Sequence, residues 1–144
     1  MGRIHAEGWR PGVGRTHLGR DAVTPTARTL AALRAQGYIA AVTEKWIPQM
    51  KRRVDLFGCI DILAFQPNVP GVLGIQATTA AHVSERMEKA KAEPRMAQWL
   101  VYGMGRRFAV WGWRKIGPRG KRKKWEPIVK DLELWEPIVK DLEL

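Results

Sequence analysis

The residues best suited to chemistry in this chain are a few acidic and amide side chains that interrupt apolar runs. Asp61 stands within the run CIDILAF, residues 59–65, where a carboxylate is costly unless it is paired or bound to a metal. In the run GIQAT, residues 74–78, the alternation of a strand puts Gln76 and Thr78 on one face. If a hairpin joins the two runs, Asp61 and Gln76 lie side by side and form a candidate site.

Two other carboxylates are candidates for the same site. Glu44 lies on the preceding β-rich segment. Asp55 is either a further metal ligand or the ion-pair partner of Arg52 or Arg53. Carboxylate and amide oxygens suit Mg²⁺ or Mn²⁺, so the sequence predicts one of these ions as cofactor. The candidate metal ligands are Asp61, Gln76, Glu44 and Asp55.

The residue patterns that several other kinds of active or binding site require are absent from the sequence. The sequence holds neither a GxxxxGK[ST] nor a GxGxxG phosphate-binding loop. Its three histidines are far apart, and its one serine, Ser84, has no nucleophile-elbow glycines around it. The single cysteine, Cys59, excludes an internal disulfide and is expected to be a small core residue.

The elements that must position these residues alternate between helical and strand patterns. Thr24 and Pro25 begin a helix that Gly37 ends. Strand patterns follow over residues 38–47, 54–65 and 72–78, the second bent or divided at Gly58. Helical patterns over 79–91 and from Pro94 precede strands over 107–115 and 125–134. The fold class is α/β, with a mixed sheet flanked by helices.

The position of Asp61, fifteen residues before Gln76-Ala77-Thr78, resembles the signature of the PD-(D/E)XK nuclease superfamily. The resemblance covers residues 24–134 and implies the αβββαβ restriction-endonuclease-like core. Small archaeal-type and phage Holliday junction resolvases are the most similar members in size and basicity. It implies an Mg²⁺-dependent or Mn²⁺-dependent endonuclease that cuts branched or four-way DNA as a homodimer.

Two positions depart from the family pattern. Gln76 stands where an acid is usual, and its amide oxygen can still bind a metal. Thr78 stands where the family has a catalytic lysine, so another basic group has to take that role. Arg86 and Lys89, one turn apart on the next helical segment, are our candidates. The candidate catalytic residues are Asp61, Gln76, Glu44, Thr78, Arg86 and Lys89.

The positive charge of the chain makes a nucleic acid the expected partner. A net charge of +11 over 144 residues favours phosphate binding with release of counterions. The candidate contacts are Lys51, Arg52 and Arg53 in a turn, and Arg114, Lys115, Arg119, Lys121, Arg122, Lys123 and Lys124 in a loop. Arg106 and Arg107 are expected to add to the same end of the sheet as this loop.

The seven tryptophans divide between the core and the surface. Trp99, Trp111 and Trp113 lie on apolar faces and are expected to be buried. Trp46 and Trp125 flank basic segments, where they are candidates for stacking on unpaired bases.

The two ends of the chain differ from its middle. Residues 1–23 are rich in glycine and arginine and are expected to form a flexible basic arm. Residues 135–144 repeat residues 125–134 without change, so the second copy is a recent duplication or an artefact. No apolar stretch approaches the ~20 residues that span a bilayer, and we expect a reducing cytoplasm in a bacterial, archaeal or phage-infected cell.

Two alternatives to a nuclease remain open. Loss of the acid and the lysine is compatible with a nuclease-like protein that binds DNA without cleaving it. An RNA-binding accessory protein would also account for the charge, and it would prefer RNA over DNA junctions.

Overall fold

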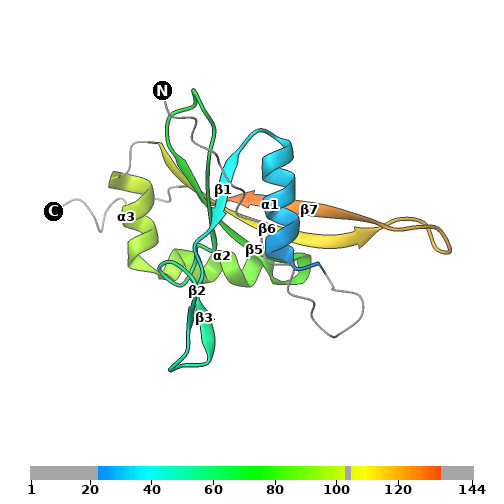
Figure 1. Cartoon of the computed structure of the whole chain (residues 1–144), viewed down its shortest axis with the longest axis horizontal. Helices are drawn as coiled ribbons and strands as arrows, with labels where there is room; N and C mark the ends of the chain where they lie inside the picture. The colour runs from blue at the N-terminus through cyan, green and yellow to red at the C-terminus, as the bar shows by residue number, and fades with distance from the viewer. Residues whose placement is uncertain (1–22, 103–104, 134–144) are drawn as a thin grey trace, which may run out of the picture.

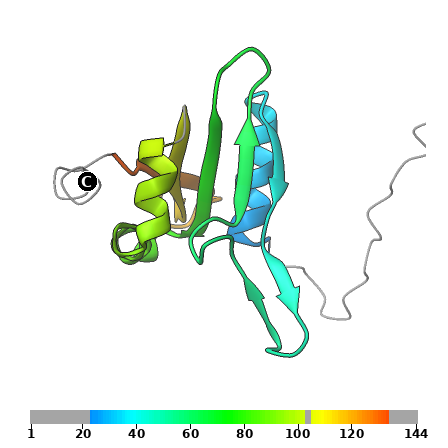
Figure 2. The same ribbon diagram turned by 90° about the vertical axis from the view of Figure 1, so that its left-hand side faces the viewer.

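The computed structural model describes residues 23–102 and 105–133. A five-stranded mixed sheet lies between α1 on one face and α2 with α3 on the other (Figure 1 and Figure 2). The predicted α/β class with a mixed sheet flanked by helices is therefore confirmed. The expected basic arm falls outside the described residues except for Val23, and the second decapeptide, 135–144, lies wholly outside them.

The elements follow the chain as α1 (Pro25–Ala35), β1 (Ile39–Val42), β2 (Lys45–Ile47), β3 (Arg52–Val54), β4 (Ile62–Phe65), β5 (Val72–Thr79), η1 (Ala80–His82), α2 (Val83–Ala92), α3 (Pro94–Tyr102), β6 (Arg106–Ile116) and β7 (Lys124–Asp131). The main sheet has the order β1-β4-β5-β6-β7. Strands β5 and β6 are parallel, and the other neighbours are antiparallel. Because parallel strands need a long crossover, α2 and α3 occupy the connection between β5 and β6.

Helix α1 begins and ends where its sequence predicts. The Thr24 hydroxyl accepts a hydrogen bond from the Ala27 N–H at 3.1 Å, and Pro25 takes the first helical position. Gly37, with φ +89°, allows the chain to turn back toward β1. Leu33 is fully buried against the sheet, so the amphipathic pattern of α1 decides which face it presents.

The sheet separates two apolar clusters. Trp111 and Trp113 on β6 pack toward α1, whereas Val110 packs toward α2 and α3 together with Met87 and Met96. This alternation follows from the two-residue period of a strand. The predicted burial of Trp111 and Trp113 is confirmed, and Trp99 packs against the second cluster. Cys59 is also buried there, as expected.

A glycine on β6 brings the second helical layer close to the sheet. A Cβ atom at Gly112 would collide with the side chain of Val83, the first residue of α2. Gly112 also pairs with Thr78 across the parallel β5–β6 ladder. The start of α2 is therefore held directly over the end of β5.

Two of the expected strands are divided; the sequence pattern predicts the division of 54–65 near Gly58 as one of two possibilities, but it does not predict the division of 38–47. The segment 38–47 forms β1 and then β2, and β2 pairs with β3 in a separate ribbon that extends away from the main sheet (Figure 2). Arg52 and Arg53 therefore lie on a strand, and of the expected basic turn only Lys51, with φ +49°, is in the turn. Residues 55–61 form a loop closed by a bridge between Leu56 and Ile60.

The division has a local cause at the end of β1. The Thr43 N–H donates to the Asp61 carbonyl at 2.8 Å, and the Thr43 hydroxyl donates to the Ile60 carbonyl at 2.9 Å. These bonds hold Thr43 against the start of β4, and beyond it the chain leaves the main sheet. Among the described residues, no helix is long and apolar enough to cross a membrane.

Helix α1 is joined to the sheet by a buried polar contact that can be tested. The Thr29 hydroxyl accepts from the Trp113 Nε1–H at 2.9 Å and donates to the Pro25 carbonyl at 2.8 Å. We expect Thr29→Val to lower the free energy of unfolding by ~1–3 kcal/mol, because the indole N–H loses its partner. Urea denaturation measures this, with Thr26→Val on the same helix as the matched control. Equal losses in the two variants would contradict the assignment.

Candidate functional site

Asp61 lies directly before β4 and is held in the hydrogen-bond pattern of the sheet. Its N–H donates to the Ile75 carbonyl at 2.9 Å, and both carboxylate oxygens accept from the Ala77 N–H at 3.2 Å. Continuing the β4–β5 register, in which Ile62 pairs with Ile75, places Asp61 opposite Gln76. The expected hairpin is thus present. The Ala77 N–H was not found by sequence reasoning, because a backbone donor leaves no signal in residue types.

Gln76 presents an unsatisfied oxygen at this position. The residue is 3% exposed, and its Nε2 donates to the Asp55 carboxylate at 3.3 Å. Its Oε1 is buried and has no hydrogen-bond partner in the part of the chain that the structure describes. A buried acceptor without a partner costs ~1–3 kcal/mol. An oxygen of this kind beside carboxylates fits a hard divalent cation.

The carboxylates around Gln76 influence one another's charge. Burial raises the pKa of Asp61 to about 7, and the negative charges of Asp55 and Glu44 act in the same direction. The Ala77 N–H opposes this rise in the Asp61 pKa. Burial also raises the pKa of Asp55, with a further contribution from Glu44, against the positive charges of Lys89 and Arg86. Negative charge is therefore crowded here, as it is at many functional sites.

Glu44 is placed differently from the expectation. It lies between β1 and β2 rather than on a strand, and it forms an ion pair with Arg53 at 2.6 Å. It lines a cavity of about 480 Å³ next to the start of α1, whereas Asp55 lines another of about 230 Å³. Within residues 23–102 and 105–133, no three His, Cys, Asp or Glu side chains are close enough to hold a metal ion. A ligand set here therefore needs the Gln76 oxygen.

The smaller cavity combines a carboxylate with basic residues. It is lined by Arg52, Arg53, Val54, Asp55, Gly58 and Lys89. The basic residues come from the ribbon and from α2, and the acid comes from the loop between β3 and β4. A cation at the acid and a phosphate at the basic side chains would be compatible in this space.

The position of the expected lysine is occupied by Thr78, and the basic residues of this region come from α2. Thr78 is buried on β5, on the same face as Gln76. Arg86 and Lys89 of α2 both lie close enough to Asp55 for their charges to act on its pKa. The Arg86 Nε is buried and has no hydrogen-bond partner among the described residues. Two basic groups are thus near the carboxylates although Thr78 supplies none.

The second basic cluster extends along the β6–β7 hairpin, which projects beyond the helices (Figure 1). Arg114 and Lys115 lie on β6 and Lys124 on β7, so only the middle of the cluster is in the connecting loop. Arg114 faces Glu126 across the hairpin at 3.6 Å. The other members, Arg119, Lys121, Arg122 and Lys123, are exposed.

One expectation about the basic surface is wrong, and another stays a prediction. Arg106 and Arg107 are the first two residues of the eleven-residue strand β6, at the opposite end from the hairpin loop. Trp125 is 41% exposed, but the Arg28 guanidinium covers its ring at 3.9 Å and the Lys115 ammonium lies 5.2 Å from it. Two cations of this chain thus lie near its ring, and its stacking on bases stays a prediction. Trp46, on β2, is 52% exposed, and its stacking role stays a prediction.

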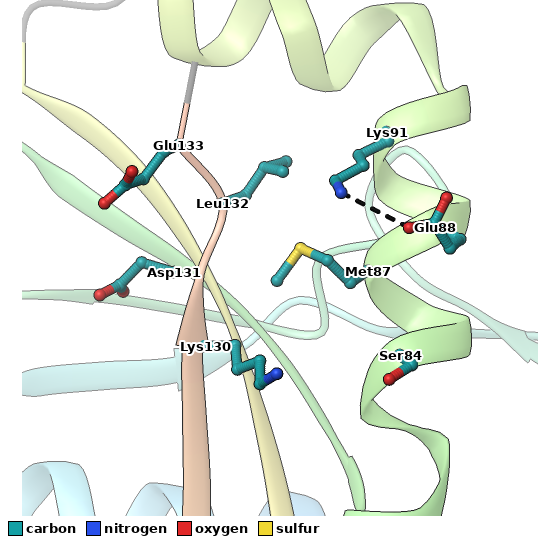
Figure 3. A pocket seen from close by; sticks show the side chains of 8 residues that line it. All are labelled: Ser84, Met87, Glu88, Lys91, Lys130, Asp131, Leu132 and Glu133. Carbon is teal, nitrogen blue, oxygen red and sulfur yellow. Dashed lines mark hydrogen bonds and ion pairs between the residues drawn. The ribbon is translucent and has the colours of Figure 1, made fainter. Parts of the chain in front are cut away.

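A different cavity, of about 480 Å³, lies between α2 and the end of β7 (Figure 3). Lys130 and Leu132 point toward α2, whereas the side chains of Asp131 and Glu133 point away from it (Figure 3). Glu88 is paired with Lys91 at 3.4 Å. The carboxylates that line this cavity do not point toward one another, so the cavity is a weaker candidate than the surroundings of Asp61.

Comparisons with protein-family models, with curated proteins and with solved structures find no match to this chain. Any assignment of function therefore depends on the residues around Asp61 and Gln76 and on the order of the elements that hold them.

Burial of Asp61 predicts a pH-dependent effect on stability without divalent metal. A raised pKa means that the folded protein binds this proton more tightly than the unfolded chain, so the contribution of Asp61 falls as pH rises from about 4 to about 7. We expect the free energy of unfolding of Asp61→Asn, measured relative to the parent protein, to rise by about 2–3 kcal/mol when the pH is raised from 5 to 8.

Urea denaturation at the two pH values, in EDTA, measures this difference. Asp131→Asn, at an exposed carboxylate on β7, is the matched control and should show no such change. A difference between Asp61→Asn and the parent protein that stays constant with pH would contradict the raised pKa.

Proposed function

We propose that this chain is a metal-dependent endodeoxyribonuclease of the PD-(D/E)XK type, which hydrolyses phosphodiester bonds in branched DNA as a Holliday junction resolvase. The observation that carries the proposal is the pairing of Asp61, held by the Ala77 N–H, with Gln76, whose buried Oε1 has no partner among the described residues.

The arrangement of the elements supports the same superfamily. Asp61 directly precedes β4, the second strand of the main sheet along the chain, and Gln76 and Thr78 lie on β5, the third. A helix precedes these strands, and helices separate them from β6. The order of the core is the one that the resemblance implies, with the β2–β3 ribbon inserted between its first two strands.

The residues present fit an Mg²⁺ or Mn²⁺ ion. Asp61, Asp55 and the Gln76 amide oxygen would hold it, and Glu44 is a more distant candidate because Arg53 already occupies it. Such an ion polarises a phosphodiester and lowers the pKa of a bound water. Burial of Asp61 and Gln76 limits the competition from bulk water for these oxygens.

The remaining residues of the site bind and orient the DNA strand. Arg86 and Lys89 compensate the charge of the carboxylates and would supply the basic group that Thr78 lacks. Lys51, Arg52 and Arg53 on the ribbon hold phosphates next to the cavity, because ion pairing with phosphate does not depend on base sequence. The β6–β7 hairpin supplies a separate basic surface for a second DNA segment.

A second candidate function is DNA binding without cleavage. It is favoured by Thr78 in the place of the lysine and by the absence of a three-carboxylate group among the described residues. Both functions use the same basic surface, and they differ in whether product forms. The family resemblance also implies a homodimer, since a junction has two strands to cut.

Metal-dependent cleavage is the primary test. Labelled four-way junctions, duplex, single-stranded DNA and RNA are incubated with the protein in Mg²⁺, Mn²⁺ or EDTA. We expect nicks near the branch point in either metal, none in EDTA, and a loss of about 10²-fold or more in rate for Asp61→Asn.

The control is Asp131→Asn, which should cleave at the parent rate. Tight junction binding without product in every metal would overturn the nuclease and support the binding protein. A preference for RNA without junction selectivity would overturn both and support the RNA-binding alternative.

The role of the α2 basic residues gives a separate prediction. If Arg86 and Lys89 replace the missing lysine, each alanine variant should lower the cleavage rate by about 10-fold or more while junction affinity in EDTA changes less. Lys91→Ala, two residues after Lys89 on the same helix, serves as control because Lys91 pairs with Glu88. Full cleavage rates for both Arg86→Ala and Lys89→Ala would contradict this role.

A further inference from the structure

A cavity of about 440 Å³ beside the candidate metal site has no role in the proposed cleavage. It is lined by Phe57, Arg95, Gln98, Trp99 and Arg106. These residues come from the loop between β3 and β4, from α3 and from the first position of β6. Two aromatic rings and two guanidinium groups therefore meet in one space.

Each guanidinium lies over one ring. Arg95 is 5.1 Å from the centroid of Phe57, and Arg106 is 5.1 Å from the centroid of Trp99. The Trp99 Nε1–H donates to the Arg107 carbonyl at 2.9 Å, which fixes the orientation of the indole. The two rings also pack against the buried cluster beneath α2 and α3, so the cavity has an apolar base that is held in place.

The positive charge in this cavity is only partly neutralised. Arg95 pairs through its Nε with Glu93 at 2.7 Å. Arg106 has no ion-pair partner in the part of the chain that the structure describes, and its Nε is buried without an acceptor. A half-buried guanidinium without an anion favours an anionic ligand.

The cavity adjoins the candidate metal site. Phe57 follows Asp55 by two residues in the same loop. The thiol of Cys59, also in that loop, is close enough to both Asp55 and Arg95 to be affected by the charge of each. Consecutive residues of one loop therefore line the two cavities, Gly58 the Asp55 cavity and Phe57 this aromatic cavity.

We propose that this cavity binds one unpaired nucleotide of the DNA strand. Its phosphate lies at Arg106 and Arg95, and its base lies against Trp99, Phe57 and the side chains around them. Single-stranded nucleotides are commonly bound by aromatic rings, arginine planes and nearby positive charge. The volume lies in the range of sites for a ligand of this size. Gln98 adds an amide that can pair with a base edge.

This inference rests on the proposed function only in that the ligand belongs to DNA. It gives a physical basis for structure selectivity, because a fully paired duplex offers no free nucleotide, whereas a branch point or strand end does. Neither phosphate alone nor an apolar compound alone uses both the guanidinium groups and the rings.

The test measures binding in EDTA, so that cleavage does not enter. Two fluorescent duplexes are compared by anisotropy, one blunt and one with a short single-stranded thymidine extension. We expect Arg106→Gln to weaken the affinity for the extended duplex by at least about fivefold and to leave the affinity for the blunt duplex nearly unchanged. Arg95→Gln, at an exposed residue, should act in the same direction.

Arg107→Gln is the matched control, because it removes the same charge at the next residue, whose side chain points to the other face of β6. Thermal unfolding confirms that each variant is folded. If Arg106→Gln and Arg107→Gln weakened the affinity for the blunt and the extended duplex to the same extent, the proposal would be overturned and general charge attraction would explain the binding. Displacement of the extension by inorganic phosphate as readily as by thymidine 5′-monophosphate would overturn the base contact. A protein that fails to cleave junctions but passes this test would lose only the proposed nuclease activity.

Discussion

The burial of the Asp61 carboxylate is the constraint on which the site depends. Asp61 is 5% exposed, and the hydrogen bonds of its carboxylate within the described residues come from one N–H, that of Ala77. A carboxylate in such surroundings is stabilised by a proton or by a cation. The charges of Asp55 and Glu44 increase this requirement. The unpartnered Gln76 oxygen, the basic residues of α2 and the basic cavity rim all lie where they would complement a cation and its phosphate.

The sheet supplies the geometry for this arrangement. Antiparallel pairing of β4 with β5 places Asp61 opposite Gln76, and parallel pairing of β5 with β6 requires the crossover that brings α2 over the same face. Gly112 lets α2 approach closely, so Arg86 and Lys89 reach the surroundings of Asp55. The candidate metal site, the basic rim and the aromatic cavity are therefore consequences of one topology, even though their residues are distributed over the chain.

Local patterns were sufficient to predict the long, periodic elements and one key pairing. The Thr24 cap, the helical pattern of α2 and the burial of Trp111 and Trp113 on β6 all follow from local chemistry. Asp61 opposite Gln76 was also predictable, because a period of two and one hairpin decide it. The β2–β3 ribbon was not, since Thr43 is held by Ile60 and Asp61, which are distant in sequence. The cover of Arg28 over Trp125 and the Arg106 cavity are likewise contacts between distant segments.

We propose above that Asp61 and Gln76 belong to a divalent-metal site. Anomalous diffraction from crystals of the full chain soaked in Mn²⁺ tests this most directly, because it locates the ion without requiring activity. We expect a peak within bonding distance of an Asp61 carboxylate oxygen and of Gln76 Oε1, at the ~2.0–2.4 Å typical of oxygen ligands to such ions, and no such peak in Asp61→Asn crystals. Manganese peaks confined to other carboxylates, such as Asp131 and Glu133 at the end of β7, with none at Asp61, would contradict it.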